Sequence, residues 1–411
     1  MSSLPEASGP AALHWKTLSG KFGHQIWRLN SDTLCAEARR RSRLEDFGDP
    51  PLDPVLTILV NSLELETGLH PLGRFLIVVH LRGLLETRLR LTNIWSRHAE
   101  AIESSTIRRP IVITGMPRSG STFLHELLAE DPENRAPRAW EVMFPISSGV
   151  EPPRELNSRV RKAEFSLWCF RRLAPGADSV YPMRARTPQE CIAIHSYTFL
   201  SEEFGTTCHV PTYKTFLHGA NLGPTYAWQR RFLQYLQLGC LKKRWVLKSP
   251  NHVYSLDKLL GVFPDALIVR THRDPIDVIK SQIELIRVLE GLFARRRDDH
   301  EIVRREVQTI QEIADHILRF QDKYLVNSGQ VVDVTYSELI ADPMAVIQRI
   351  YNRLEMGLSE TAANRMRRLA LNRSRYRRRN GRSRSTDSIL NRTIDASRFE
   401  PYCSRFGVQF K

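Results

Sequence analysis

A short apolar run that ends in glycine and leads directly into an apolar helix constrains the fold of this chain more than any other feature. Residues 110–115, with the sequence PIVITG, predict a buried strand, and residues 122–129 carry apolar side chains at helical spacing. The loop between them, GMPRSGST, would point backbone N–H groups and the positive end of a helix dipole at an anion. The sequence therefore predicts an anion-binding loop at the end of a buried strand.

Three further strand–loop–helix units follow the first. The predicted strands are residues 245–248, 266–270 and 331–335, and apolar side chains at helical spacing follow each of them. Apolar strands that alternate with amphipathic helices are typical of a parallel sheet with helices on both faces. We therefore predict an α/β fold, a three-layer parallel sheet whose P-loop-like loop and other ligand-binding loops lie at the carboxyl ends of the strands.

Other regions flank or interrupt this α/β pattern. Residues 1–108 predict a helical N-terminal region, which adds a helical layer, and residues 109–411 predict the α/β domain. Within that domain, the residues at about 151–244 are rich in Pro, Trp, Tyr and His, and their helix and strand patterns are broken. We interpret this region as an insertion that lines a substrate cleft.

A basic C-terminal loop is predicted at about residues 365–384, which contain ten Arg and no acidic residue. Much of the net charge of +15 over 411 residues lies there. One interpretation is a solvated loop, or an arm that makes peripheral contact with a membrane or binds nucleic acid nonspecifically. The other is a lid that closes over a phosphorylated ligand.

Cysteine usage and the apolar runs bear on the cellular compartment. The six cysteines include no CxxC pair and no His/Cys cluster with metal-site spacing, so we expect reduced thiols and no metal. The first 15 residues contain no basic stretch followed by an apolar run, which argues against a signal peptide. The longest apolar stretch, residues 75–81, is far shorter than the roughly 20 residues that span a bilayer. These features predict a soluble, cytoplasmic protein.

The loop that follows the first strand has the spacing of a nucleoside-triphosphate loop with one decisive difference. Ser121 stands where such loops carry the Lys that reaches the phosphates, and the positive charge is three residues earlier, at Arg118. Gly120 allows close approach of the backbone, and Ser119, Ser121 and Thr122 offer hydroxyl groups. An enzyme that handles Mg-ATP would lose its phosphate clamp by this change, so a kinase is disfavoured.

The loop sequence PRSGSTFL at residues 117–124 resembles the 5′-phosphosulfate loop of sulfotransferases that use 3′-phosphoadenosine 5′-phosphosulfate (PAPS). Three other segments resemble the bacterial-type family in the same order: WVLKSPNH at 245–252, VRTHRDPIDVIKSQ at 269–282 and VTYSELIADP at 334–343. The resemblance covers roughly residues 45–355. The Arg-rich run departs from the mixed-charge loop that is usual in the family.

The resemblance implies PAPS as cosubstrate, adenosine 3′,5′-bisphosphate as product, and no metal. It implies that Arg118 and residues 119–122 hold the 5′-phosphosulfate, and that Arg273 and Ser281 hold the 3′-phosphate. An arginine fork and a hydroxyl suit a phosphate chemically. Tyr336 would pack against adenine. We therefore expect two anion sites that grip opposite ends of one nucleotide.

Sulfuryl transfer needs a base for the acceptor and a positive charge for the leaving oxygen. As base we predict Glu141, 23 residues after Arg118, because sulfotransferases with a carboxylate base place it at a comparable distance. Lys248, at the end of a predicted strand, would stabilise the leaving oxygen, and Arg118 would share this role. The competing candidates for the base are histidines: His125, His195 and His252.

The acceptor, a hydroxyl or an amine on a small molecule, a lipid or a glycan, is not identified by the sequence. Aromatic residues within 160–230 suggest a lipid or aromatic acceptor, although they could equally pack in the core. A kinase and a catalytically inactive nucleotide or nucleic-acid binder remain as alternatives. The arginines are not accompanied by a repeated aromatic pattern like that of RNA-binding modules, so we expect no specific nucleic-acid partner. The oligomeric state is left open.

Overall fold

A five-stranded parallel sheet forms the centre of the computed structural model, which describes residues 29–147, 153–238, 243–295, 298–320, 329–372 and 394–409. The strand order is β2-β3-β1-β4-β5. The strands are β1 (Ile111–Gly115), β2 (Asn134–Arg135), β3 (Arg244–Lys248), β4 (Leu267–His272) and β5 (Val331–Thr335). The predicted α/β class and all four predicted strands are confirmed. β2 was not predicted, since two residues are too few to show an apolar alternation.

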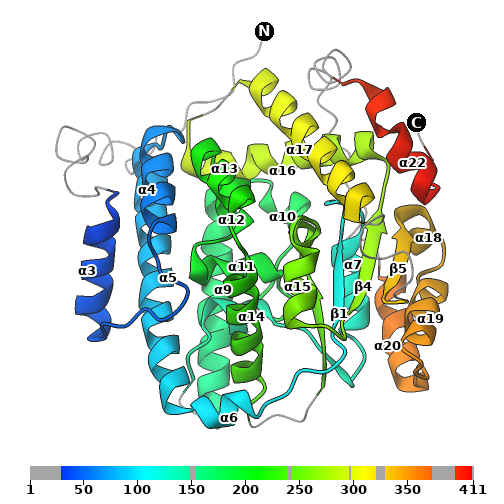
Figure 1. Ribbon diagram of the computed structural model, residues 1–411, viewed down its shortest axis with the longest axis horizontal. Helices are drawn as coiled ribbons and strands as arrows, with labels where there is room; N and C mark the ends of the chain where they lie inside the picture. The colour runs from blue at the N-terminus through cyan, green and yellow to red at the C-terminus, as the bar shows by residue number, and fades with distance from the viewer. Residues whose placement is uncertain are drawn as a thin grey trace.

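Side chains of β1 alternate between the two faces of the sheet, as a strand buried on both sides requires. Ile111 and Ile113 pack into one apolar cluster, and Val112 packs into another. Helices that follow β1 and β5 cover the first face and appear beside the sheet in Figure 1. These helices are α7 (Ser121–Leu128), α18 (Tyr336–Ala341), α19 (Pro343–Arg353) and α20 (Glu360–Leu371).

The N-terminal helices share their core with the opposite face of the sheet. Leu59 and Leu85 belong to the same cluster as Val112 and Leu247, so this helical layer packs as part of the domain. Figure 1 shows it at the side of the molecule away from α18–α20. Its members are α3 (Ser31–Ser42), α4 (Val55–Leu65), α5 (Pro71–Arg97) and α6 (Ala99–Glu103). The predicted helical layer is confirmed for the described residues.

Between β2 and β3 the chain is helical, which the broken sequence patterns did not reveal. Proline or glycine begins several of these helices, as at Pro211 and Gly223, and divides the apolar periodicity into short pieces. The helices are α8 (Ala139–Met143), α9 (Pro153–Leu173), α10 (Ala177–Val180), α11 (Cys191–His195), η1 (Ser196–Thr198), α12 (Glu202–Thr207), α13 (Pro211–Gly219) and α14 (Gly223–Leu236).

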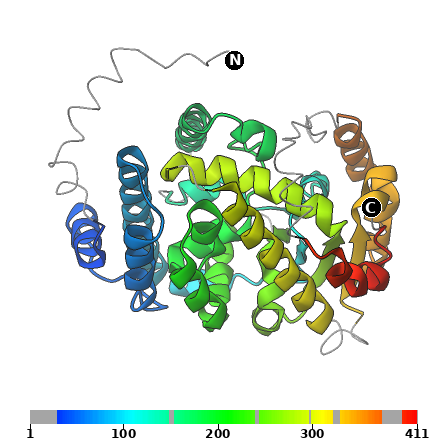
Figure 2. The ribbon, with the colours of Figure 1, turned by 90° about the horizontal axis from the view of Figure 1, so that it is seen from above.

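Two long helices and the C-terminal helix pack together near the carboxyl ends of the strands, as Figure 2 shows from above. His272 of β4 bonds the hydroxyl of Tyr402 (2.9 Å) and the carboxylate of Asp333 (2.9 Å), which fixes the C-terminal helix to the sheet. The two long helices are α16 (Pro275–Phe293) and α17 (Asp299–Phe320), and the C-terminal helix is α22 (Glu400–Phe406). The shorter helices of these parts of the chain are η2 (Pro250–Tyr254), α15 (Leu256–Val262) and η5 (Ala396–Phe399).

The predicted basic loop at 365–384 is described only up to residue 372, within and just after α20. The remaining residues of that loop, and the lid predicted there, lie outside the described part of the chain. Among the helices that the structure describes, none combines the length and the apolar character needed to cross a membrane.

Candidate active site

The register of the central strands brings three predicted loops to one edge of the sheet. Gly115 at the end of β1 pairs with Thr271 of β4, and Ile113 pairs with Lys248 at the end of β3. Because all three strands are parallel, the loops that follow them leave from the same edge. The anion loop, the Lys248 segment and the Arg273 segment therefore adjoin one another.

Two glycines shape the loop between β1 and α7. Gly115 has a φ of +116°, and a Cβ there would collide with the backbone carbonyl of Thr271. Gly120 caps α7 with a φ of +88°, and a Cβ there would lie 3.1 Å from the ring of Tyr336. Both positions therefore need glycine for conformation and for space.

The hydroxyl groups of the loop have different surroundings. Ser119 is buried, and its hydroxyl bonds the carbonyl of Met116 and the hydroxyl of Thr271 at 2.6 Å. It therefore holds the loop to β4, and its hydroxyl faces the sheet. Ser121 is also buried at the start of α7, whereas Thr122 is half-buried.

Arg118 joins the two predicted anion sites. Its Nε donates a hydrogen bond to the hydroxyl of Ser281 on α16 (2.9 Å), and its backbone carbonyl accepts one from Nη1 of Arg273 (3.0 Å). The Arg273 guanidinium also lies over the ring of Tyr336, 4.3 Å from the centroid, and pairs with Asp277 at 3.3 Å. The structure thus brings Arg118, Arg273, Ser281 and Tyr336 together.

Lys248 connects this loop with a carboxylate that the sequence analysis missed. Its buried Nζ donates to Oγ1 of Thr122 at 3.3 Å and forms an ion pair with Oε1 of Glu190. Glu190 is the N-cap residue of α11, within the region predicted only as an insertion. Its own sequence context gives no signal for this position, because the contact depends on how the insertion folds back to β3.

The segment that leads to Glu190 lies against the segment that leads to Glu141, the predicted base. Gln189 donates its backbone N–H to the carbonyl of Pro137 (2.7 Å) and accepts a bond from the Tyr181 hydroxyl (3.3 Å). Burial, followed by the charge of Glu190, raises the pKa of Tyr181 well above its ordinary value, and Arg118 opposes this shift. Tyr181 therefore lies within electrostatic reach of both charged groups.

Glu141 is buried, and both of its carboxylate oxygens have partners. Oε2 accepts the backbone N–H of Arg138 at the start of α8 (2.9 Å), and Oε1 forms an ion pair with Arg135 (2.7 Å). The Arg135 guanidinium in turn lies over the ring of Trp245, 4.9 Å from its centroid. These are the contacts of a carboxylate that fixes a helix N-terminus. The predicted catalytic role of Glu141 stays a prediction.

The three candidate histidines are all buried. His125 lies on the buried face of α7 with Nε2 at 3.1 Å from the carbonyl of Val246, and burial, together with Lys248, lowers its pKa to about 3. His195 contacts Gln229 (2.6 Å), and burial lowers its pKa to about 4. His252 bonds the hydroxyl of Tyr226 through Nδ1, while its Nε2 has no hydrogen-bond partner among the described residues.

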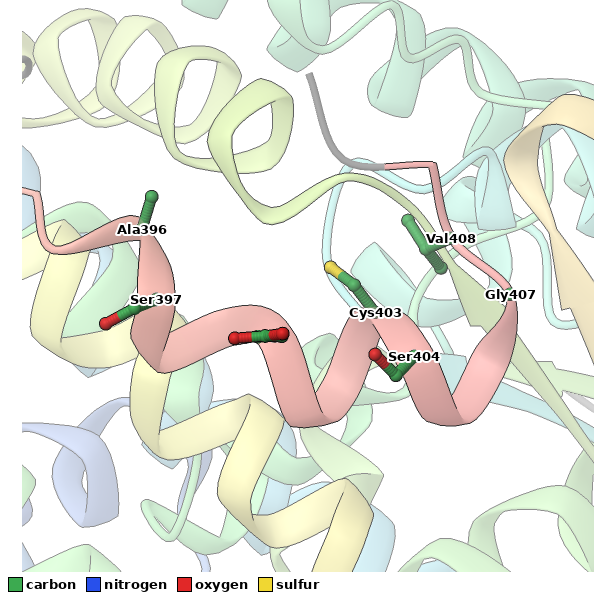
Figure 3. Close-up of a pocket in the computed structure, with 7 residues that line it drawn as sticks. Ala396, Ser397, Cys403, Ser404, Gly407 and Val408 are labelled. Carbon is green, nitrogen blue, oxygen red and sulfur yellow. The ribbon is translucent and has the colours of Figure 1, made fainter.

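A cavity of about 60 Å³, lined by both polar and apolar side chains, lies beside the Lys248 segment. Ser249, which follows Lys248, lines it together with His195 and His252, and Ile192 approaches it from the helix that Glu190 caps. A wider, open hollow of about 490 Å³ lies beside α22 and is lined by residues of the C-terminal segment, as Figure 3 shows. None of the predicted site residues lines that second hollow.

Most of the aromatic residues proposed for the acceptor cleft are core residues. Tyr197, Phe199, Phe204 and Tyr213 are buried in the main apolar cluster, and Phe216 packs against it. Trp168 is exposed on α9, and Tyr181 is the residue of this group near Glu190. Aromatic content alone therefore gave little information about the acceptor.

Comparison with known proteins identifies the family. A family model described as the sulfotransferase family matches residues 110–360, which include the anion loop, the Lys248 segment and the Arg273 segment. The chain belongs to the sulfotransferase family, and it is therefore an enzyme of the transferase class. The predicted resemblance is confirmed. Two mycobacterial relatives, both omega-hydroxy-beta-dihydromenaquinone-9 sulfotransferase Stf3, from Mycobacterium bovis and Mycobacterium tuberculosis, are 24% identical over 296 residues, 65% of this chain and 68% of the relative.

Solved structures agree with this assignment over nearly the whole chain. Sulfotransferase STF1 from Mycobacterium tuberculosis H37Rv has a TM-score of 0.77 at 29% identity and covers 92% of this chain and 98% of its own. Sulfotransferase STF9 from Mycobacterium avium has a TM-score of 0.80 at 24% identity, with 93% and 98% covered. The N-terminal helices are therefore part of a fold that these proteins share.

Proposed function

We propose that this chain transfers the sulfuryl group of PAPS to a hydroxyl group of an apolar acceptor. The observation that carries the proposal is the junction at Arg118, whose side chain reaches Ser281 and whose carbonyl is held by Arg273. A nucleotide with charge at one end only would need one of these sites. Two adjoining cationic sites suit a ligand with anionic groups at both ends.

The residues present fit such a ligand. Nε of Arg273 is buried without a hydrogen-bond partner among the described residues, and a buried charged donor of this kind calls for an acceptor. Gly115 and Gly120 keep side chains out of the anion loop. Arg118 and the backbone of residues 119–122 would hold the phosphosulfate, Arg273 and Ser281 the 3′-phosphate, and Tyr336 the adenine.

The ion pair between Lys248 and Glu190 would supply the two charges that the reaction needs. PAPS provides an activated sulfuryl group whose bond to a phosphate oxygen breaks in the transfer. Lys248, which touches Thr122 of the loop, would neutralise the charge on the leaving oxygen. Glu190 would accept the proton of the acceptor hydroxyl, because its partner Lys248 lies at the loop. Glu141 remains the alternative base, although its oxygens are engaged by Arg135 and α8.

The cavity beside Lys248 is our candidate for the reacting end of the acceptor. It is small, and its lining combines polar groups with apolar side chains, so it would receive a hydroxyl group and its neighbouring apolar atoms while the rest of the acceptor stays outside. His252 offers a buried nitrogen without a partner in the described part of the chain, which could bond that hydroxyl. The name of the mycobacterial relatives indicates that those proteins act on a hydroxylated menaquinone, which favours a lipid hydroxyl here as well.

Transfer of radioactive sulfur tests the proposal. The purified chain, incubated with ³⁵S-labelled PAPS and a bacterial lipid extract, should label a lipid that is absent from the same reaction with Arg273→Ala. Lys258→Ala is a matched control, since this lysine lies on α15 and pairs with Asp257 at the surface. No labelled product from any extract, or equal labelling by the Arg273→Ala variant, would contradict the proposed function.

A further inference from the structure

We propose that the outward face of α9 docks on the surface of an anionic membrane. This α9 face consists of Arg161, Phe165, Trp168, Arg172 and Leu173, all exposed. Arg161, Phe165, Trp168 and Arg172 follow one another at spacings of four, three and four residues, so they form a single stripe along the helix. The proposal that this face binds a membrane is independent of the proposed sulfuryl transfer.

The centre of the α9 face is aromatic although it is solvent-exposed. Phe165 is 65% exposed and Trp168 is 52% exposed, and their rings stack on each other with centroids 5.9 Å apart. Single exposed apolar residues are common on proteins, whereas adjoining large ones mark a contact surface. Tryptophan beside another aromatic ring suits the boundary between lipid headgroups and acyl chains.

The opposite side of α9 explains why these rings face outward. Ala163 is buried against Trp140, and the guanidinium of Arg159 lies over the Trp140 ring, 4.7 Å from its centroid. Leu167 is also buried. The inner side of α9 thus packs against the rest of the protein through other residues, and this packing does not involve Phe165 and Trp168. Figure 2 shows the helix at the periphery of the molecule.

Charge on α9 favours an anionic partner. Of the described side chains of α9, residues 156–173, one is a carboxylate, Glu164, and it accepts the backbone N–H of Ala185 (2.8 Å). Arg161 and Lys162 flank the aromatic pair on one side, and Arg172 flanks it on the other. Basic residues beside a membrane surface are attracted by anionic headgroups, while the aromatic rings enter the apolar boundary.

The start of α5, near α9, carries further exposed apolar residues. Leu76 of α5 and Phe170 of α9 pack against the same small cluster, so the two helices are neighbours there. On α5, Leu72, Phe75 and Val79 are exposed at helical spacing. Together the two helices present aliphatic and aromatic groups, a composition that suits lipid better than the bases of a nucleic acid.

A second copy of this chain fits the α9 face less well than a membrane does. In a two-fold dimer through this face, α9 would meet the same helix of the other copy. Since the stripe is basic at both ends, with Arg161 at one and Arg172 at the other, either orientation would bring like charges together. Such contacts are unfavourable, whereas an anionic bilayer would be attracted to both ends.

Vesicle binding by the full chain tests the proposal. We expect the protein to sediment with phosphatidylcholine vesicles that contain about one third phosphatidylglycerol, and to bind pure phosphatidylcholine vesicles more weakly. The double variant Phe165→Ser/Trp168→Ser should lower the partition coefficient by about tenfold or more. Leu65→Ser, at an 81% exposed leucine at the end of α4, is the matched control and should bind like the wild type.

Other outcomes would overturn the proposal. Vesicle binding by the double variant that equals that of the wild type would contradict it. The same holds if the double variant still binds vesicles while Arg367→Gln/Arg368→Gln on α20 does not. A wild-type chain that does not bind vesicles but binds single-stranded DNA would also overturn the proposal. So would a wild-type chain that does not bind vesicles and forms a dimer, if the double variant is a monomer. Should the double variant fail to fold, quenching by brominated lipids gives a second readout, which should fall in Trp168→Phe.

Discussion

Nε of Arg118 donates a hydrogen bond to the hydroxyl of Ser281, 2.9 Å away, although 163 residues separate them in the sequence. One residue belongs to the loop after β1, and the other lies on α16 after β4. Their contact follows from the parallel pairing of β1 with β4, which places both loops at one sheet edge. The two predicted anion sites therefore form one continuous cationic surface.

Loss of the Ser281 hydroxyl should weaken nucleotide binding modestly. Ser281→Ala removes the proposed hydroxyl donor to the 3′-phosphate and a partner of Arg118, so we expect affinity for adenosine 3′,5′-bisphosphate to fall roughly 3- to 10-fold, the range of one hydrogen bond. Calorimetric titration measures it. Ser104→Ala, at an exposed serine after α6, should match the wild type. Unaltered affinity in Ser281→Ala would contradict this role.

The carboxylates of Glu190 and Glu141 should respond differently to neutralisation. Glu190→Gln removes the proposed proton acceptor, so kcat should fall by about 10² to 10⁴ while affinity for the bisphosphate is largely retained. Glu141→Gln weakens the ion pair with Arg135, so Tm should fall while kcat stays near that of the wild type. Steady-state kinetics and thermal melting of both variants distinguish the roles. A large loss of kcat in Glu141→Gln alone would establish the original prediction instead.

His252 provides a separate check on the base. If Glu190 accepts the proton and His252 only bonds the acceptor, His252→Asn should raise KM for the acceptor more than it lowers kcat. A loss of kcat in His252→Asn as large as that in Glu190→Gln would argue for the histidine. Binding of adenosine 3′,5′-bisphosphate, measured in parallel, should be unchanged in both variants.

A methyl group at position 120 should damage both the fold and the site. Gly120 has a φ of +88°, and a Cβ there would be 3.1 Å from the Tyr336 ring and 3.0 Å from Leu339. We expect Gly120→Ala to destabilise the protein by about 1–3 kcal/mol and to weaken bisphosphate binding. Denaturant titration and calorimetry measure the two effects. Gly261→Ala, where an added Cβ meets nothing within 4 Å, is the control.

The Asp333 carboxylate should contribute stability that depends on pH. Burial acts to raise its pKa, but hydrogen bonds from His272 and Arg270 outweigh burial and lower the pKa to about 2 from an ordinary 3.8. Because the folded pKa is depressed, the contribution is present above about pH 4 and is lost as the pH falls through about 2.

The pH dependence of this stabilisation is tested by thermal melting of the wild type and Asp333→Asn, from neutral pH down to the onset of acid unfolding. The Tm advantage of the wild type should shrink as the pH approaches 2. An advantage that is constant or grows on acidification would contradict the assignment.

The parts of the site that could be predicted from the sequence are those fixed by local motifs at strand ends. Arg118, Lys248 and Arg273 each follow or end a strand that its apolar residues identify, and parallel pairing then brings them together. Glu190 could not be predicted, since it reaches Lys248 only through the path of the helical insertion. His125 was a candidate base because it follows the anion loop closely in the sequence. Its position on α7 instead directs its side chain towards Val246 of β3.

The central claim is that one site binds the anionic groups at both ends of a single nucleotide, with Arg273 binding the 3′-phosphate. Calorimetric titration of adenosine 3′,5′-bisphosphate and of adenosine 5′-monophosphate into wild type and Arg273→Ala tests it most directly. We predict that the wild type binds the bisphosphate at least about tenfold more tightly than the monophosphate, and that Arg273→Ala largely abolishes this preference. Equal affinities in the wild type, or a preference that survives in Arg273→Ala, would contradict it.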